Sequence, residues 1–488
     1  MKREKQMNKK ILLILPLFSL LICSCTKNDE DNNEDFNPVD YANEIHFDES
    51  QSYLREGIKS YNFYNFNDFH GATEYIPENG EPGINYLSSY LKQEKNKAIE
   101  NNEGFILTSS GDMWQGSADS NITRGRLVID WLNSLSCQAQ AIGNHEFDWG
   151  KETIQNNIEL MDFPLLACNI IDIETNVLVD YVKPFTTSTI NGLNIGFIGS
   201  IGSSLKSSIL LDNVRDVNFI DPTENIIKSS NYLKQNGADV IVLLNHDSFA
   251  GIEVYDYIDI AFNGHSHTYE NSTFNNVPSM QAYCNGKAVS YVKLNFDYTT
   301  NDISFPSKNV ISLSSIPSKY EEDEETVELY QSYLNNEINE VKNQVCGTIS
   351  SSLSRSDIIT YLLDLINLYY VDNWKSEFDN VCFITHNNAR SDLSAGEITY
   401  GMIYKALPFD NNICLLKMSN SEAKFFKNDC EYSLIVDADK SNDKYIYILT
   451  IDYLAQKFEN NYNIETVKTF DKFPRDIFFE YFSRLNLF

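Results

Sequence analysis

The stretch AQAIGNHEFD, residues 139–148, decides the fold because it joins a short apolar run to a polar, histidine-bearing cluster. The apolar residues Ala139–Ile142 indicate a buried strand. Gly143 then allows the backbone to turn sharply next to a ligand. Polar side chains begin at Asn144, where the strand should end. The stretch therefore predicts a strand whose C-terminal end carries functional side chains.

Further strand-like runs alternate with helical patterns along the first two thirds of the chain. The runs are Tyr61–Phe66, Phe105–Thr108, Leu193–Ile198, Val240–Leu244 and Ile260–Phe262, with helices expected over Leu87–Lys97 and Pro222–Gln235. This alternation predicts a layered α/β domain. Alternating strands are expected over 288–312, at its edge.

Five polar clusters directly follow such runs. They are Asn67–Gly71, Ser110–Asp112, Gly143–Glu146, Asn245–Asp247 and Gly264–His267. Because the C-terminal ends of parallel strands converge on one edge of a sheet, we expect these clusters to meet in space.

The clusters hold five of the seven histidines of the chain, together with aspartate and asparagine. Imidazole and carboxylate groups suit divalent transition metals, and an asparagine carbonyl can add a further oxygen ligand. In the two pairs Asp68-x-His70 and His265-x-His267, extended backbone would point both side chains the same way. The sequence therefore predicts a dinuclear metal site. His46 and His386 have no such context and are expected to be structural.

The ordered motifs DxHG, GD, GNHE, H and GHxH resemble those of the calcineurin-like metallophosphoesterases, specifically the bacterial 5′-nucleotidase and 2′,3′-cyclic phosphodiesterase branch. The resemblance covers residues 56–312. It implies an α/β fold of four-layer type, with two β-sheets flanked by helices. It also implies two divalent ions, for which zinc, manganese and iron all suit the residue types.

The resemblance assigns a role to each motif residue. Asp68, His70 and His267 would bind one ion, Asn144, His246 and His265 would bind the other, and Asp112 would bridge both. His145 would stabilise the phosphoryl oxygen or protonate the leaving alkoxide, oriented by Asp148. The nucleophile would be a metal-activated hydroxide. Glu146 and Asp247 receive no role.

Residues 346–488 resemble the substrate-binding domain of the same branch. Arg390 matches a phosphate-contacting arginine, while Phe409 and Tyr453 match two aromatic residues that sandwich the base. The pattern differs at Asn387 and Asn388, where the family has glycine, and over 457–460, where it has GGDG. Nucleoside 5′-monophosphates are the expected substrates of this hydrolase. The alternatives are a cyclic-nucleotide phosphodiesterase, a nucleotide-sugar hydrolase, a broad phosphatase or, in another class, a non-catalytic surface-binding lipoprotein.

The boundary between the two domains is marked by the acidic run Glu321–Glu325, followed by apolar residues at helical spacing. A helix is expected around Ile358–Tyr370, a strand over Val381–Ile384 and a terminal helix over Ile477–Phe482. The predicted divisions are a lipoprotein signal peptide (1–24), an acidic tether (25–55), a metallophosphoesterase domain (56–312), a linker helix (313–345) and a smaller α+β substrate domain (346–488).

The N-terminus indicates export. A basic start precedes the apolar run Ile11–Ile22, which is too short to span a bilayer but suits a signal peptide. Ser24 before Cys25 resembles a lipobox, so Cys25 is the expected lipidation site, with a plain cleaved signal as the alternative. A lipid anchor would place the protein at the outer membrane or cell surface, facing the periplasm or the exterior.

Charge narrows the range of partners. Residues 1–24 carry five positive charges and one negative, so their removal takes the net charge from −31 to −35. Such a chain repels long nucleic acid, whereas a small phosphate ester can bind where metal ions supply positive charge. The seven cysteines after Cys25 show no metal or disulfide spacing. The sequence does not fix an oligomeric state.

Overall fold

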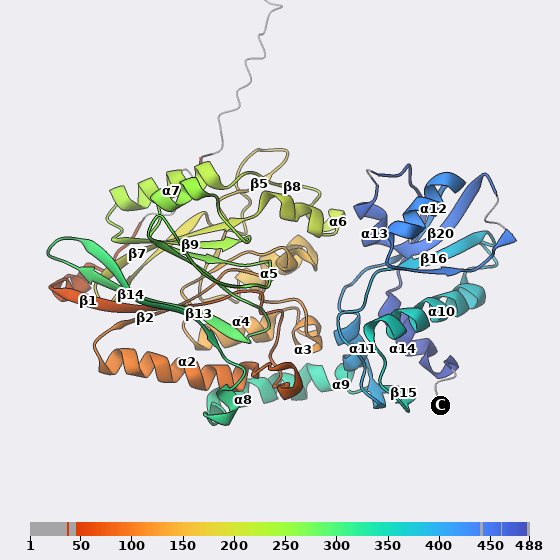
Figure 1. Ribbon diagram of the computed structural model, residues 1–488, viewed down its shortest axis with the longest axis horizontal. Coiled ribbons are helices and arrows are strands. Elements are labelled where there is room, and N and C mark those ends of the chain that lie inside the picture. Colours follow the sequence, from red (N-terminus) through yellow and green to blue (C-terminus); the bar gives the residue numbers. More distant parts are fainter. Residues whose placement is uncertain (1–36, 39–44, 440–442, 460, 486–488) are drawn as a thin grey trace, which may run out of the picture. The chain divides into compact units, whose positions relative to one another are not determined.

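The computed structural model describes residues 37–38, 45–439, 443–459 and 461–485 (Figure 1). The predicted signal peptide, Cys25 and the first part of the acidic tether lie outside the described residues. Among the described residues, no helix combines the length and apolar character needed to cross a bilayer.

Two six-stranded sheets form the N-terminal domain. The first has the order β14 (Asp302–Ser312), β13 (Ala288–Asp297), β1 (Ile58–Phe66), β2 (Gly104–Ser109), β3 (Ala139–Ala141) and β4 (Leu165–Leu166). The second has the order β11 (Tyr269–Phe274), β12 (Val277–Ala282), β10 (Ile260–Asn263), β9 (Val240–His246), β7 (Leu193–Ile201) and β6 (Phe185–Ile190). The strands β1 to β4 are parallel, as are β7, β9, β10 and β12. The strand runs expected from the sequence are all present.

The inner faces of the two sheets share one apolar core, in which Phe63 and Ile106 of the first sheet join Phe197 and Val242 of the second. Helix α2 (Gly83–Glu100) lies outside the first sheet and α7 (Thr223–Gln235) outside the second (Figure 1). These layers confirm the expected four-layer α/β architecture. Smaller elements are α3 (Ala118–Ile122), α4 (Arg126–Ser134), α5 (Gly150–Ile158), α6 (Leu211–Val214), β5 (Ile170–Asp172) and β8 (Val217–Phe219).

The linker helix ends earlier than the spacing of apolar residues predicts. Helix α8 (Glu324–Tyr333) continues through a π turn over Leu334–Ile338 into α9 (Asn339–Lys342). Asp323 caps its first turn by accepting a hydrogen bond from the Thr326 N–H. Val345, which the apolar spacing assigned to this helix, instead begins strand β15 (Val345–Ile349).

The C-terminal domain has a five-stranded sheet with helices on both faces. Its order is β19 (Tyr432–Ile435), β16 (Val381–His386), β20 (Tyr445–Ile451), β18 (Ile413–Ser419) and β21 (Glu465–Phe470). The helices are α10 (Arg355–Asn373), α11 (Tyr400–Ala406), α12 (Asn420–Asp429), α13 (Asp452–Lys457) and α14 (Pro474–Tyr481). A small sheet pairs β15 with β17 (Gly396–Thr399). The cysteines of the described residues form no disulfide, and six of these seven are buried.

Residues 45–55, the end of the predicted tether, are folded onto the N-terminal domain. The Arg55 guanidinium donates to both carboxylate oxygens of Asp239, at 2.7 and 2.8 Å, and to the Gly192 carbonyl at 3.1 Å. The Asp48 N–H donates to Thr189 Oγ1 at 2.9 Å. Because Gly192 and Asp239 precede β7 and β9, this segment is held at the N-terminal ends of the strands.

Candidate metal centre

The predicted ligand clusters converge at the C-terminal ends of the central strands. The strands β1, β2, β3, β9 and β10 end at or just before the clusters that begin at Asn67, Ser110, Gly143, Asn245 and Gly264. The structure groups their side chains so that donor atoms lie within 4.8 Å of one another in three overlapping sets. The expected meeting of the five clusters is therefore observed.

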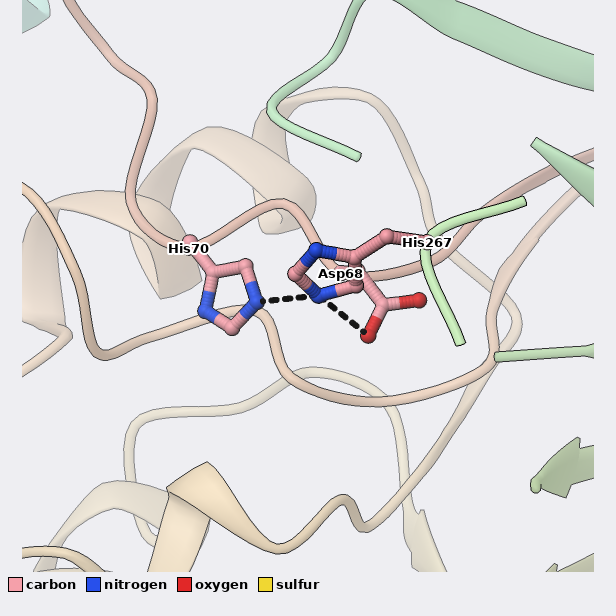
Figure 2. A group of neighbouring side chains, drawn as sticks. All are labelled: Asp68, His70 and His267. Carbon is pink, nitrogen blue, oxygen red and sulfur yellow. Dashed lines mark hydrogen bonds and ion pairs between the residues drawn. The ribbon is translucent and has the colours of Figure 1, made fainter. Parts of the chain in front are cut away.

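The first set consists of Asp68, His70 and His267. His267 Nε2 lies 3.1 Å from His70 Nε2 and 3.4 Å from Asp68 Oδ1, so the three side chains point toward a common centre (Figure 2). Asp68 is fully buried. A buried carboxylate facing two imidazole nitrogens is a donor set that a divalent cation would satisfy.

The second set consists of Asp112, His246 and His265. His246 Nε2 lies 3.1 Å from Asp112 Oδ2. Asn144 belongs to the same group, because its Oδ1 is 3.2 Å from His246 Nε2 and 3.0 Å from His265 Nδ1. All seven residues proposed as ligands thus lie in one cluster, with Asp112 present in two of the three sets.

His145 and Asp148 form a hydrogen-bonded pair beside this cluster. His145 Nδ1 lies 2.8 Å from Asp148 Oδ2. The backbone N–H of His145 donates to Asp112 Oδ1, also at 2.8 Å. The third set consists of His145, His70 and Asp112. The ring of His145 therefore lies within 4.8 Å of donor atoms of two proposed ligands. The Asn213 side chain donates to the backbone carbonyl of Asp148 at 3.0 Å. This hydrogen bond fixes Asp148, which in turn orients His145.

Backbone carbonyls orient two of the histidine ligands. His70 Nδ1 is 2.9 Å from the Gln115 carbonyl, and His246 Nδ1 is 2.7 Å from the Ser110 carbonyl. Since a carbonyl oxygen only accepts, the proton of each ring is on Nδ1. Each Nε2 therefore faces the cluster, and in the neutral ring this nitrogen has the lone pair that a metal ligand needs.

The paired ligands are not on extended backbone, contrary to the sequence expectation. Asp68, His70, His265 and His267 have φ angles of 50°, 50°, 68° and 50°, in the left-handed region. These residues lie in loops beyond the strand ends. The conformation of each loop brings its pair of side chains together, and the alternation of side chains along a strand plays no part. At Gly143, an added Cβ would lie 2.2 Å from Asp112 Oδ1, so this position excludes any side chain.

Glu146 is a residue of the site to which the motif gave no role. Its side chain is fully buried and its carboxylate accepts from the N–H groups of Gly143, Asp112, Met113 and Trp114 at 2.7 to 3.2 Å. It thereby ties the loop that carries Asp112 to the loop that carries Asn144. A carboxylate directly after a ligand loop was the only signal in the sequence.

The carboxylates and histidines of the cluster shift one another's pKa values. Burial favours the neutral acid, yet His246 and His145 hold the pKa of Asp112 well below its usual value. Burial also opposes protonation of His246, but Asp112 raises the pKa of this imidazole to about 10. Burial lowers the pKa of His70 to about 4, which leaves its lone pair free. Nitrogen and oxygen donors around buried carboxylates fit two divalent ions.

Two of the three predicted substrate-contacting residues, Arg390 and Phe409, lie together. The Arg390 guanidinium carbon is 4.9 Å from the centre of the Phe409 ring. The same ring stacks on His145, with centres 5.8 Å apart and planes inclined by 25°. Tyr453 is partly buried at the start of α13. Phe409 thus connects the C-terminal domain to the group of proposed metal ligands, which we call the candidate metal cluster.

Arg475 holds the loop that carries Phe409, and nothing in the sequence pattern indicated it. The side chain is 3% exposed, and its guanidinium donates to the Phe409 carbonyl at 2.9 Å and to the Asp410 carboxylate. The guanidinium carbon is 4.0 Å from the centre of the Tyr404 ring. The contact joins residues 66 positions apart in the chain, so only the fold could reveal it.

Comparison with known families divides the chain in the same way. The calcineurin-like phosphoesterase family matches residues 61–269, and the 5′-nucleotidase C-terminal domain matches residues 339–422. Cell wall protein Lmo0130 of Listeria monocytogenes is 25% identical over 434 residues, covering 73% of this chain and 54% of that protein. The 5′-nucleotidase of Homo sapiens is 24% identical over 411 residues, covering 73% of this chain and 69% of that protein. The chain thus spans about half the length of the Listeria relative.

Solved structures share the fold. The 5′-nucleotidase precursor from Thermus thermophilus superposes with a TM-score of 0.71 at 16% identity, covering 87% of this chain and 96% of that one. A 5′-nucleotidase structure from Staphylococcus aureus gives a TM-score of 0.68 at 16% identity, covering 88% and 98%. Both domains are therefore arranged on a scaffold that these proteins also have.

Proposed function

Since this chain belongs to the calcineurin-like metallophosphoesterases and carries a 5′-nucleotidase C-terminal domain, we propose that it hydrolyses nucleoside 5′-monophosphates. The observation that carries the proposal is the meeting of seven nitrogen and oxygen ligands with the His145–Asp148 pair and, through Phe409, with Arg390.

The proposed metal ligands are those of the three sets together with Asn144. Two divalent ions, when bound there, supply Lewis acidity and an activated water for attack on phosphorus. Asp112 suits the bridging position because it is common to two sets and its carboxylate has two oxygens. Zinc, manganese and iron all accept this mixture of imidazole, carboxylate and amide ligands.

His145 is proposed to act on the phosphoryl group or the leaving oxygen. Its Nδ1 faces Asp148, so Nε2 is the atom left to donate a hydrogen bond or a proton. Although burial disfavours the cation, Asp148 and then Asp112 raise the pKa of His145 to about 9. Asp148 thus has two effects: it fixes the ring and it stabilises the protonated form.

Arg390 and Phe409 support a nucleotide as the substrate. Burial, and among the charges Arg355, lower the pKa of Arg390. Two neighbouring guanidinium groups suit a doubly charged phosphate. Phe409, with Tyr453 as its proposed partner, offers an aromatic face on which a base can stack without its edge being read.

A substrate panel tests the proposal. Phosphate release from AMP, a 2′,3′-cyclic nucleotide, UDP-glucose and p-nitrophenyl phosphate ranks the nucleotidase against a phosphodiesterase, a nucleotide-sugar hydrolase and a broad phosphatase. We expect AMP to give the highest kcat/KM, with about two metal equivalents after reconstitution. Equal rates for AMP and p-nitrophenyl phosphate would reject the nucleotide assignment, and a metal-loaded protein inert toward all four would favour the binding lipoprotein.

We further propose export and lipidation at Cys25, which rests on the signal-like N-terminus and the serine before this cysteine. Radiolabelled palmitate should be incorporated by the wild-type chain in a Gram-negative host and lost in Cys25→Ala. Equal labelling of both proteins would exclude Cys25 as the site.

A further inference from the structure

A small cavity in the C-terminal domain adjoins the proposed nucleotide contacts. Its lining includes His386, Asn387, Arg390, Phe409 and Arg475, and its volume is about 20 Å³. This is room for a single water-sized group and not for a base or a sugar. A group of that size projecting from a bound base is therefore what the cavity can admit.

His386 is the polar side chain that decides the chemistry of this cavity. It is the last residue of β16 and is 6% exposed. Its Nδ1 lies 2.8 Å from the Asn387 carbonyl, which can only accept, so the ring proton is on Nδ1. Across the described part of the chain, Nε2 has no hydrogen-bond partner. His386 thus lines the cavity with a ring whose Nε2 lone pair is not used by any described residue.

The imidazole is neutral, and its surroundings keep it so. Burial lowers the pKa of His386 to about 4, which agrees with a ring that accepts a hydrogen bond at Nε2 near pH 7. The loop that follows is fixed: Asn388 Oδ1 accepts from the Ala389 N–H at 2.9 Å, and the Arg390 N–H donates to the Ala406 carbonyl at 2.9 Å. The acceptor is thus held in place beside Arg390.

One of the two guanidinium groups in the lining, that of Arg475, is already engaged. Arg475 donates to the Phe409 carbonyl, to Asp410 and, at 3.4 Å, to the Tyr400 hydroxyl. A carbonyl group entering the cavity would accordingly meet the lone pair of His386 without gaining this guanidinium. An amino group would instead donate to that lone pair.

We propose that this cavity is a specificity subsite in which His386 Nε2 accepts a hydrogen bond from the exocyclic amino group of a nucleobase. The inference rests on the proposed nucleotidase function and adds a preference to it. Adenine and cytosine carry such an amino group, whereas hypoxanthine and uracil carry a carbonyl oxygen in its place. Nucleotides with an amino group should be favoured by about tenfold in kcat/KM. The buried acceptor gains a hydrogen bond from an amino group but faces another acceptor when the base carries a carbonyl.

The experiment compares AMP with IMP, and CMP with UMP, in the wild-type protein and in His386→Phe. Phenylalanine is planar and of similar size but has no acceptor. We expect the variant to lose the preference by hydrolysing AMP and CMP more slowly, while the rate with p-nitrophenyl phosphate, which has no base, changes far less. An unchanged AMP to IMP ratio in His386→Phe would overturn the proposal.

A change in the substrate tests the same hydrogen bond without altering the protein. Purine riboside 5′-monophosphate lacks the 6-amino group, so wild-type kcat/KM should fall about tenfold relative to AMP. Equal hydrolysis of AMP, IMP and this analogue, all far faster than p-nitrophenyl phosphate, would overturn the subsite and leave the nucleotidase standing. Hydrolysis of AMP no faster than p-nitrophenyl phosphate would overturn both.

Discussion

The candidate metal cluster and the proposed nucleotide-contacting region, with Arg390, Phe409 and Tyr453, are built in different ways. In the cluster, the ends of five strands of one domain and the short loops after them supply every proposed ligand, and backbone carbonyls fix the rings of His70 and His246. In the other region, Arg390, Phe409 and Tyr453 come from separate elements, and Phe409 depends on the distant Arg475. In the proposed assignment, chemistry common to all phosphate esters is therefore local, whereas choice among esters depends on tertiary contacts. Substitutions should separate the two when AMP and p-nitrophenyl phosphate are assayed side by side.

The largest effect is expected from Asp112→Asn. The change removes the carboxylate shared by two ligand sets, so activity toward both esters should fall by roughly 10³-fold or more, about 4 kcal/mol. Steady-state rates together with metal analysis check this. Turnover within tenfold of the wild type would disprove the bridging assignment.

His145→Gln should reduce kcat by about 10²- to 10⁴-fold for AMP and for p-nitrophenyl phosphate, the range of general acid–base catalysis. The metal content should remain that of the wild type, because the change leaves all seven proposed ligands in place. Loss of bound metal in this variant would instead make His145 a ligand, as its grouping with His70 and Asp112 allows.

Glu146→Gln keeps the shape of the side chain but turns an acceptor into a donor opposite backbone N–H groups. The loops of Asp112 and Asn144 should shift, and metal affinity and both activities should fall about 10- to 100-fold. Titration of the metal-stripped protein measures the affinity. Saturating metal should restore part of the rate, and a wild-type affinity would show that the four hydrogen bonds are dispensable.

Phe409→Leu tests the second region. Losing an aromatic face is worth roughly 1–3 kcal/mol per base, so KM for AMP should rise about fivefold or more. The rate with p-nitrophenyl phosphate should change far less. An equal effect on both esters would mean that Phe409 acts through its contact with His145 and not through a base.

Arg475→Lys should have the smallest effect, a few-fold rise in KM for AMP with kcat retained, since lysine cannot make the paired contacts to Phe409 and Asp410. Arg484→Lys is the matched control, because Arg484 also pairs with an aspartate and lies over a tyrosine ring in the same domain. If both variants behave alike, Arg475 has a purely structural role.

The sequence predicted the layers and the central strands from the alternation of apolar runs with helical patterns. It also predicted which residues meet in the candidate metal cluster, because each polar motif directly follows an apolar run. It did not predict how the pairs Asp68–His70 and His265–His267 are shaped, since left-handed backbone in a loop has no periodicity to detect. The contacts of Glu146 and Arg475 were equally hidden. One depends on where four N–H groups point, and the other joins segments that meet only after the domain has folded.

The attachment of residues 45–55 has a mechanical consequence. Tension applied through the chain before Ile45 would be borne by Asp48 and by the paired hydrogen bonds of Arg55 with Asp239, at the strand ends opposite the metal cluster. The load would enter β7 and β9 at their beginnings, where hydrogen-bonded neighbours on both sides share it. The loops that carry Asp68, Asp112 and His265 lie outside that path. A pull on the N-terminal segment would therefore reach the second sheet at the end opposite the candidate metal cluster.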